Sequence, residues 1–170
     1  AVVLGLTQAL GGANNSVLIA TGSIVGAMLA PSKSLATIPV AIYVVGIWFG
    51  TLPVGWLARR FGRRASFQVG TVAGILTGIL CLAGVVWASF LLFSLGAFAG
   101  GFYAAAMQGY RFAAADTASP AFRPKAISWV MAGGVASGVI GPQLIIHTKD
   151  MLPPLTFAAT FVGQALLAVG

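Results

Sequence analysis

The segment Gly55-Trp56-Leu57-Ala58-Arg59-Arg60-Phe61-Gly62-Arg63-Arg64 decides the fold of this chain. It places four arginines within six residues, between two long apolar runs, and these are four of the nine lysines and arginines in the chain. Compact positive charge between two segments of hydrocarbon length is typical of a short cytoplasmic loop that joins two membrane-spanning helices. The segment therefore predicts a polytopic membrane protein.

The composition of the 170 residues supports the same class. Hydrophobic residues make up 59% of the chain and charged residues 6%, and the mean hydropathy is +1.00. Soluble domains contain about 25% charged residues, so this chain could not build a water-facing surface. In a soluble protein the net charge of +7 would suggest a nucleic-acid partner. Here the basic residues lie in short loops and hold them in the cytoplasm, so we expect no nucleic acid.

Six stretches are long and apolar enough to cross about 30 Å of hydrocarbon. The breaks between them are short and rich in turn formers and charges, as neighbouring antiparallel helices require. We therefore expect an all-α domain over residues 1–170, and because both ends lie in apolar segments we expect it to be part of a longer protein. The predicted helices run over about 2–29, 35–58, 66–87, 90–115, 126–146 and 153–170.

Positive charge is unevenly divided between the two sides of the predicted bundle. The four arginines of the opening segment fall on the same side as Arg123 and Lys125, whereas the other side has only Lys33 and Lys149. An excess of six against two predicts that the first side is cytoplasmic. The first and last residues should then also lie near the cytoplasm.

Small residues recur four apart on the fifth predicted helix, as in close contacts between membrane helices. One ladder consists of Gly133, Ser137 and Gly141, which Pro142 follows, and a second of Gly134 and Gly138. We interpret the ladders as helix-packing surfaces, and the alternative is that such seams slide during gating.

Polar side chains at membrane depth are costly, and they usually face a cavity or a partner helix. The first predicted helix contains Gln8, Asn14 and Asn15. Neighbouring helical residues point about 100° apart, so we expect one asparagine to face a lumen and the other to bond to a neighbouring helix. A purely structural role for the pair is the alternative.

The fourth predicted helix contains Gln108 and Arg111, which are three residues apart and share a face. Arg111 either snorkels to the interface or pairs with Asp116 or a neighbouring helix, or it attracts an anion in a water-filled cleft. The last interpretation favours an anionic solute.

Catalysis has little support in the sequence. Cys81 and His147 are the only residues of their types, so they cannot form a metal cluster. Ser137 lacks a base, because His147 lies ten residues later, about 15 Å along the same helix. We therefore expect no enzyme, no metal and no cofactor.

The opening segment resembles motif A of the major facilitator superfamily, which reads Gly-x-x-x-Asp-Arg-x-Gly-Arg-Arg between the second and third helices. The residues that match are Gly55, Arg60, Gly62, Arg63 and Arg64. Arg59 departs from the motif, because it replaces the usual aspartate. Gln108-Gly109 is a weaker match to motif B, and Ser137-x-x-x-Gly141-Pro142 is a partial match to motif C.

The resemblance covers the whole chain and implies the N-terminal half of a twelve-helix transporter, built from two inverted three-helix repeats. It implies secondary active or facilitative transport of a small solute by alternating access, in a bacterial inner membrane. The second six-helix half would come from the same polypeptide or from a partner chain. Because helices 1 and 4 line the solute path in this family, the implied pathway residues are Asn14, Asn15, Gln108 and Arg111.

The resemblance also implies a cytoplasmic gate. Its residues would be Gly55, Arg59, Arg60, Gly62, Arg63, Arg64 and Asp116. In the family the motif A aspartate helps to latch the two halves, but Arg59 cannot accept hydrogen bonds. We hypothesise that Asp116 supplies the missing negative charge to Arg60 or Arg63. Alternatives to transport by a twelve-helix protein are a six-helix subunit that assembles into a larger membrane complex, and a half that works as a homodimer.

Overall fold

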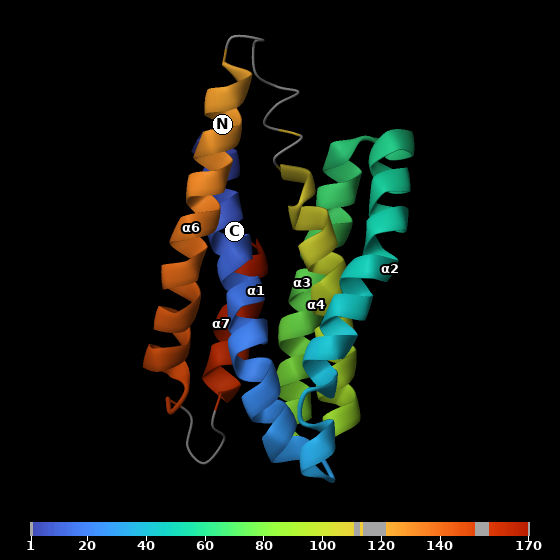
Figure 1. The fold of residues 1–170 in the computed structure, drawn as a ribbon, viewed down its shortest axis with the longest axis vertical. Coiled ribbons are helices and arrows are strands. Elements are labelled where there is room, and N and C mark those ends of the chain that lie inside the picture. Colours follow the sequence, from blue (N-terminus) through green and yellow to red (C-terminus); the bar gives the residue numbers. More distant parts are fainter. Residues whose placement is uncertain (1, 111–112, 114–121, 152–156, 170) are drawn as a thin grey trace.

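The fold is all-α in the computed structural model, which describes residues 2–110, 113, 122–151 and 157–169 (Figure 1). Over these residues it contains six α-helices and no strand. The helices are α1 (Val2–Leu29), α2 (Ile38–Phe61), α3 (Arg63–Val86), α4 (Phe90–Met107), α6 (Arg123–Thr148) and α7 (Ala158–Val169), with a short 3-10 helix, η1 (Lys33–Leu35), before α2.

Five of the described helices, all except α7, are long and apolar enough to cross a membrane. Many of their large apolar side chains point outward; Leu52 is 78% exposed on α2 and Val135 is 77% exposed on α6. Such surfaces suit hydrocarbon as the surrounding solvent. α7 is described over 12 residues, and residues 152–156 and 170 of the predicted sixth helix lie outside the described residues.

The four arginines are helical, which differs from the loop that the sequence predicted between residues 58 and 66. α2 continues through Arg59 and Arg60, and α3 already begins at Arg63. Gly62 alone joins the two helices, with φ 84° and ψ 163°. Residues other than glycine rarely adopt these backbone angles, and Gly62 therefore allows the chain to reverse direction within one residue.

The fourth helix is shorter than predicted. α4 ends at Met107 with Gln108 as its C-cap, whereas the sequence predicted one helix as far as residue 115. Gln108 is a turn residue, and the next described residues, Gly109, Tyr110 and Ala113, are helical again, so the predicted helix is interrupted at Gln108. Residues 111, 112, 114 and 115 of the predicted helix lie outside the described residues.

The helices pair in a reciprocal pattern that is consistent with two three-helix repeats. α1, the first helix of one repeat, packs most extensively against α6, the middle helix of the other. α4, the first helix of the second repeat, packs extensively against α2, the middle helix of the first, and to a similar extent against α3. The two third helices, α3 and α7, also pack together.

Glycines make both reciprocal pairs close. A Cβ at Gly133 of α6 would collide with the carbonyl oxygen of Gly5 on α1, and a Cβ at Gly46 of α2 would collide with the carbonyl oxygen of Phe98 on α4. Backbones that approach this closely gain dispersion contacts that lipid could not replace. The repeats therefore use the same kind of seam at equivalent places.

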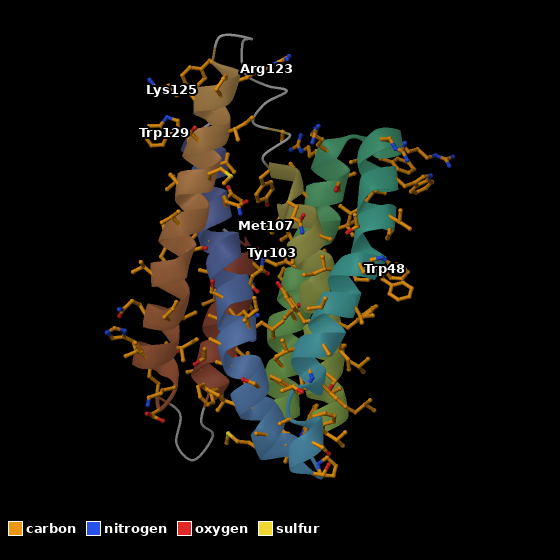
Figure 2. All side chains as sticks on the ribbon, viewed as in Figure 1. Trp48, Tyr103, Met107, Arg123, Lys125 and Trp129 are labelled. Carbon is orange, nitrogen blue, oxygen red and sulfur yellow. The ribbon has the colours of Figure 1, made fainter. Side chains whose placement is uncertain are left out.

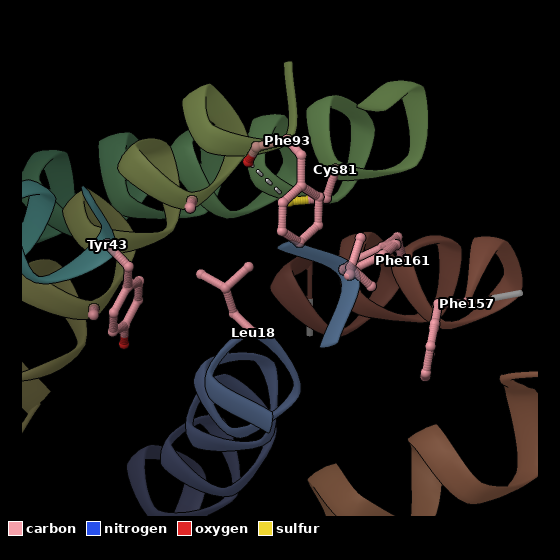
Figure 3. Packing of buried hydrophobic residues seen from close by; sticks show 9 residues of the cluster. Leu18, Tyr43, Cys81, Phe93, Phe157 and Phe161 are labelled. Carbon is pink, nitrogen blue, oxygen red and sulfur yellow. Dashed lines mark hydrogen bonds between the residues drawn. The ribbon is translucent and has the colours of Figure 1, made fainter. Parts of the chain in front are cut away.

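A core of apolar side chains fills the space where α1, α2, α3, α4 and α7 meet (Figure 3). Phe93 and Phe161 are fully buried and meet edge to face, with ring centroids 5.6 Å apart. Cys81 is buried beside them as a small packing residue. The labelled residues of this core are Leu18, Tyr43, Cys81, Phe93, Phe157 and Phe161.

Candidate functional site

Asn14 of α1 forms a hydrogen-bonded contact with α7. Its side-chain nitrogen donates to the carbonyl oxygen of Gln164 at 3.0 Å, and Gln164 Nε2 donates to Asn14 Oδ1 at 2.9 Å. Both side chains are at most 1% exposed. Two reciprocal bonds of this kind hold the two helices together, although Gln164 Oε1 has no partner among the described residues.

Asn15, the next residue, lies in a different environment. It is half-buried, and its Oδ1 atom is buried without a hydrogen-bond partner among the described residues. Gln8 is also half-buried, and its Oε1 atom is likewise without a partner. The two residues are seven apart, so they lie on one face of α1 about 10 Å from each other. Unpaired buried oxygens are acceptors available to a ligand.

The face with Gln8 and Asn15 opens beside α6. Gln8 lines a cavity of about 250 Å³ together with Val130, Met131, Gly134 and Val135 of α6. A Cβ at Gly134 would lie 4.0 Å from Gln8 Nε2, and a Cβ at Gly138 would meet no atom of the described residues within 4 Å. We call this surface, formed by Gln8, Asn15, Gly134 and Gly138, the open stripe.

The other small residues of α6 face α1. A Cβ on Gly12 would meet the hydroxyl of Ser137, which donates to the Gly134 carbonyl oxygen at 2.6 Å. A Cβ on Gly141 would meet Ser16 of α1 at 2.6 Å. Pro142 is exposed and lies beyond this contact. α6 therefore turns one ladder of small residues toward α1 and leaves the other open.

Gln108 lies away from the asparagines, at the end of α4. It lines a cavity of about 220 Å³ whose other walls include Gly55 of α2 and Arg63 of α3. Gln108 therefore lines a different cavity from the one beside Gln8, and its part in a solute pathway stays a prediction. Arg111, the fourth predicted pathway residue, lies outside the described residues.

The arginines of the opening segment have unequal surroundings. Arg63 is half-buried and donates to the carbonyl oxygen of Gly109 at 3.5 Å, so it ties the start of α3 to the residues after α4. The Arg60 guanidinium lies 5.3 Å from the centre of the Trp56 ring. Arg59 and Arg64 are exposed. Asp116, the expected partner of Arg60 or Arg63, lies outside the described residues.

Charge is divided between the two ends of the bundle. Arg123 and Lys125, at the start of α6, lie at the same end as the α2–α3 connection (Figure 2), which we call the arginine end. At the other end Lys149 forms an ion pair of 3.5 Å with Asp150. Across the described ranges, no three His, Cys, Asp or Glu side chains gather into a group that could hold a metal ion.

Sequence reasoning missed two side chains that shape the interior of the bundle. Gln164 is one, and the only signal for it was a single amide within the last apolar run. The other is Met107 of α4, which with Tyr103 reaches α1 because Gly11 leaves them room (Figure 2). A glycine on one helix opposite a large side chain on another could have indicated this contact, but the sequence does not say which helices are neighbours.

Three curated proteins resemble the chain. Riboflavin transporter RfnT of Brucella anthropi is 42% identical over 168 residues, which cover 99% of this chain and 42% of that protein. Uncharacterized MFS-type transporter YddS of Bacillus subtilis is 31% identical, over 84% of this chain and 33% of that protein. Solute carrier family 2, facilitated glucose transporter member 1 of Gallus gallus is 28% identical, over 80% of this chain and 29% of that protein.

The chain spans less than half the length of each of these relatives. No solved structure matches it significantly. The apolar helices and the relatives together make it part of an integral, multi-pass membrane protein. The sequence profile of the Major Facilitator Superfamily matches residues 4–169, and the chain therefore belongs to this superfamily.

Proposed function

We propose that this chain is one six-helix half of a transporter that moves a small solute across the membrane by alternating access. The observation that carries the proposal is the open stripe, where Gln8 and Asn15 have buried acceptor oxygens without a partner among the described residues. Polar groups at membrane depth are costly, and a solute that bonds to them offsets that cost while it is bound. The relatives are transporters, which disfavours a purely structural membrane subunit and an enzyme.

The solute we propose is a neutral compound that donates hydrogen bonds, with riboflavin as the first candidate. RfnT, which is 42% identical to this chain, is a riboflavin transporter by name. The ring N–H and the ribityl hydroxyls of a flavin are donors that suit the amide oxygens of Gln8 and Asn15. An anionic solute was expected from Arg111, and that expectation stays a prediction, because Arg111 lies outside the described residues. The polar groups of the open stripe are uncharged amides, which favours a neutral solute.

The arginine end is proposed to face the cytoplasm of a bacterial inner membrane. Arg123 and Lys125 lie at this end together with the four arginines of α2 and α3 (Figure 2). Clustered basic residues in short connections are retained on the cytoplasmic side. The first and last residues would then lie near the cytoplasm.

The second half of the transporter is proposed to come from the same polypeptide or from a partner chain. The proposal is supported by the difference in length between the two proteins, since the part of RfnT that aligns with this chain covers only 42% of RfnT. At the arginine end the two halves would meet at the gate residues of motif A. The bond between Arg63 and Gly109 supports this role, because it joins the start of α3 to the residues that follow α4. The latch between Asp116 and Arg60 or Arg63 remains part of the proposal.

The test is uptake by the complete protein, expressed in a riboflavin-requiring bacterium that lacks its own riboflavin transporter. We expect saturable uptake of radiolabelled riboflavin, far above that of cells with the empty vector. Proteoliposomes preloaded with unlabelled solutes then separate the two parts of the proposal. Exchange of another solute but not riboflavin would contradict the substrate alone, and failure to exchange any of a broad set of vitamins, sugars and amino acids would contradict transport.

A further inference from the structure

We propose that the arginine end of α3 binds one anionic phospholipid, with Arg64 at its phosphate and an acyl chain along the helix below. The site lies apart from the open stripe and does not depend on which solute is transported. It is built from a groove, a surplus of positive charge and a pair of exposed aromatic rings.

The groove runs along one face of α3. Its volume is about 470 Å³, and its lining residues are Arg64, Phe67, Gln68, Thr71 and Val72. These positions recur at three- and four-residue intervals, so they form one continuous helix face. Arg64 and Gln68 place polar groups toward the arginine end, whereas Val72 is 56% exposed farther along the helix. A charged head above an apolar wall matches the build of a phospholipid.

Among the described residues, no acidic side chain lies near the positive charge around the groove, and Arg64 is outside the proposed latch of Asp116 with Arg60 or Arg63. Arg59 and Arg60 are exposed at the end of α2, directly before Gly62 and the start of α3. Asp150 is the one acidic residue within the described ranges, and it pairs with Lys149 at the opposite end of the bundle. Guanidinium groups bind phosphate oxygens in a two-pronged geometry, and basic clusters beside membrane helices attract anionic lipids.

Two aromatic side chains place this charge at the depth of lipid headgroups. Trp56 is 48% exposed and Phe61 is 60% exposed, and the Arg60 guanidinium lies 5.3 Å and 5.7 Å from their ring centres. Exposed tryptophans gather at the boundary between hydrocarbon and water. The groove therefore begins at the headgroup layer and continues into the hydrocarbon.

A lipid fits this site better than a free phosphate ion does. An ion would use only the charged end, and it would leave the face from Phe67 to Val72 unexplained. A phospholipid uses both parts. Its phosphate would lie beside Arg64 at the start of α3, and Arg59 and Arg60 at the end of α2 add positive charge across the turn at Gly62.

The experiment is native mass spectrometry of the complete protein in detergent, with added phosphatidylglycerol or with phosphatidylcholine of the same acyl chains. We expect phosphatidylglycerol to bind preferentially, and we expect Arg64→Ala to weaken its binding about fivefold. Arg123→Ala is the matched control, because it removes an equal charge from an exposed residue at the same end, outside the groove. Arg64→Lys should retain only part of the binding, since the positive charge remains but the two-pronged contact of the guanidinium is lost.

Three results would overturn the proposal. They are equal binding of the two lipids, equal losses in Arg64→Ala and Arg123→Ala, and displacement of phosphatidylglycerol by millimolar inorganic phosphate, which would indicate a simple anion site. Arg64→Gln provides a second variant without the charge, so a poor yield of the alanine variant does not leave the question open.

Discussion

The two sides of α1 differ although they are separated by a single residue along the helix. What we call the closed side of α1 covers two faces, one where Asn14 exchanges hydrogen bonds with Gln164 of α7 and one where Gly133 of α6 meets the backbone of Gly5. On the open stripe, one residue further along each helix, Asn15 has an oxygen without a partner among the described residues, and Gly134 lines a cavity. A step of about 100° therefore separates residues that hold the bundle together from residues that are available to a solute.

The largest effect is expected at the closed side, in Gly133→Ala. Its new methyl group would collide with the carbonyl oxygen of Gly5, and neither helix backbone can yield without losing the contacts of the whole seam. We expect the free energy of unfolding to fall by about 2–3 kcal/mol. Denaturant titration of the complete protein in detergent micelles measures the change. An unchanged midpoint would mean that α1 and α6 are not closely packed in the membrane.

The next effect is expected in Asn14→Leu, which leaves the amide of Gln164 buried and without its partner. The expected loss is about 2 kcal/mol of unfolding free energy. A double-mutant cycle with Gln164→Leu sharpens the comparison, because the second change should cost little once the first has been made. Strictly additive losses would show that the two side chains do not interact.

The open stripe should respond in activity and not in stability. We expect Gln8→Leu and Asn15→Leu each to lower riboflavin uptake about tenfold, which corresponds to about 1.4 kcal/mol, because each removes one acceptor from the solute. Their unfolding midpoints should stay at the wild-type value, unlike that of Asn14→Leu. If uptake in Asn15→Leu were normal, the unpaired oxygen would have no part in solute binding.

The smallest effect is expected in Gly138→Ala, the matched control for Gly133→Ala on the same helix. A Cβ there meets no described atom within 4 Å, so no clash is introduced. The unfolding free energy should change by no more than about 0.5 kcal/mol. A loss as large as that of Gly133→Ala would place a close neighbour over the open stripe and remove the distinction between the two sides.

The fold could be predicted from the sequence because segment length and hydropathy are local properties. A run of twenty apolar residues has few alternatives to a membrane helix, whatever the rest of the chain does. Helix ends were less predictable, since they depend on backbone conformations. The reversal at Gly62 within one residue extended α2 and α3 into the arginine segment, and the turn at Gln108 shortened α4.

The candidate site could be predicted only in part. Polar residues in the first helix were an obvious signal, but the sequence could not decide between Asn14 and Asn15, because the partner of Asn14 lies 150 residues away. The placement of Gln108 with the arginines and not with the asparagines likewise depends on how α4 packs against α2 and α3. Arg111 and Asp116 remain predictions.

The single residue between α2 and α3 has a mechanical consequence. A longer linker would give slack and let one helix tilt while the other stayed in place, but Gly62 offers only its own two dihedral angles. We therefore expect α2 and α3 to swing as one lever, with Arg63 coupling that lever to the end of α4. A contact that moves the arginines at the cytoplasmic surface would then move α2, α3 and α4 together.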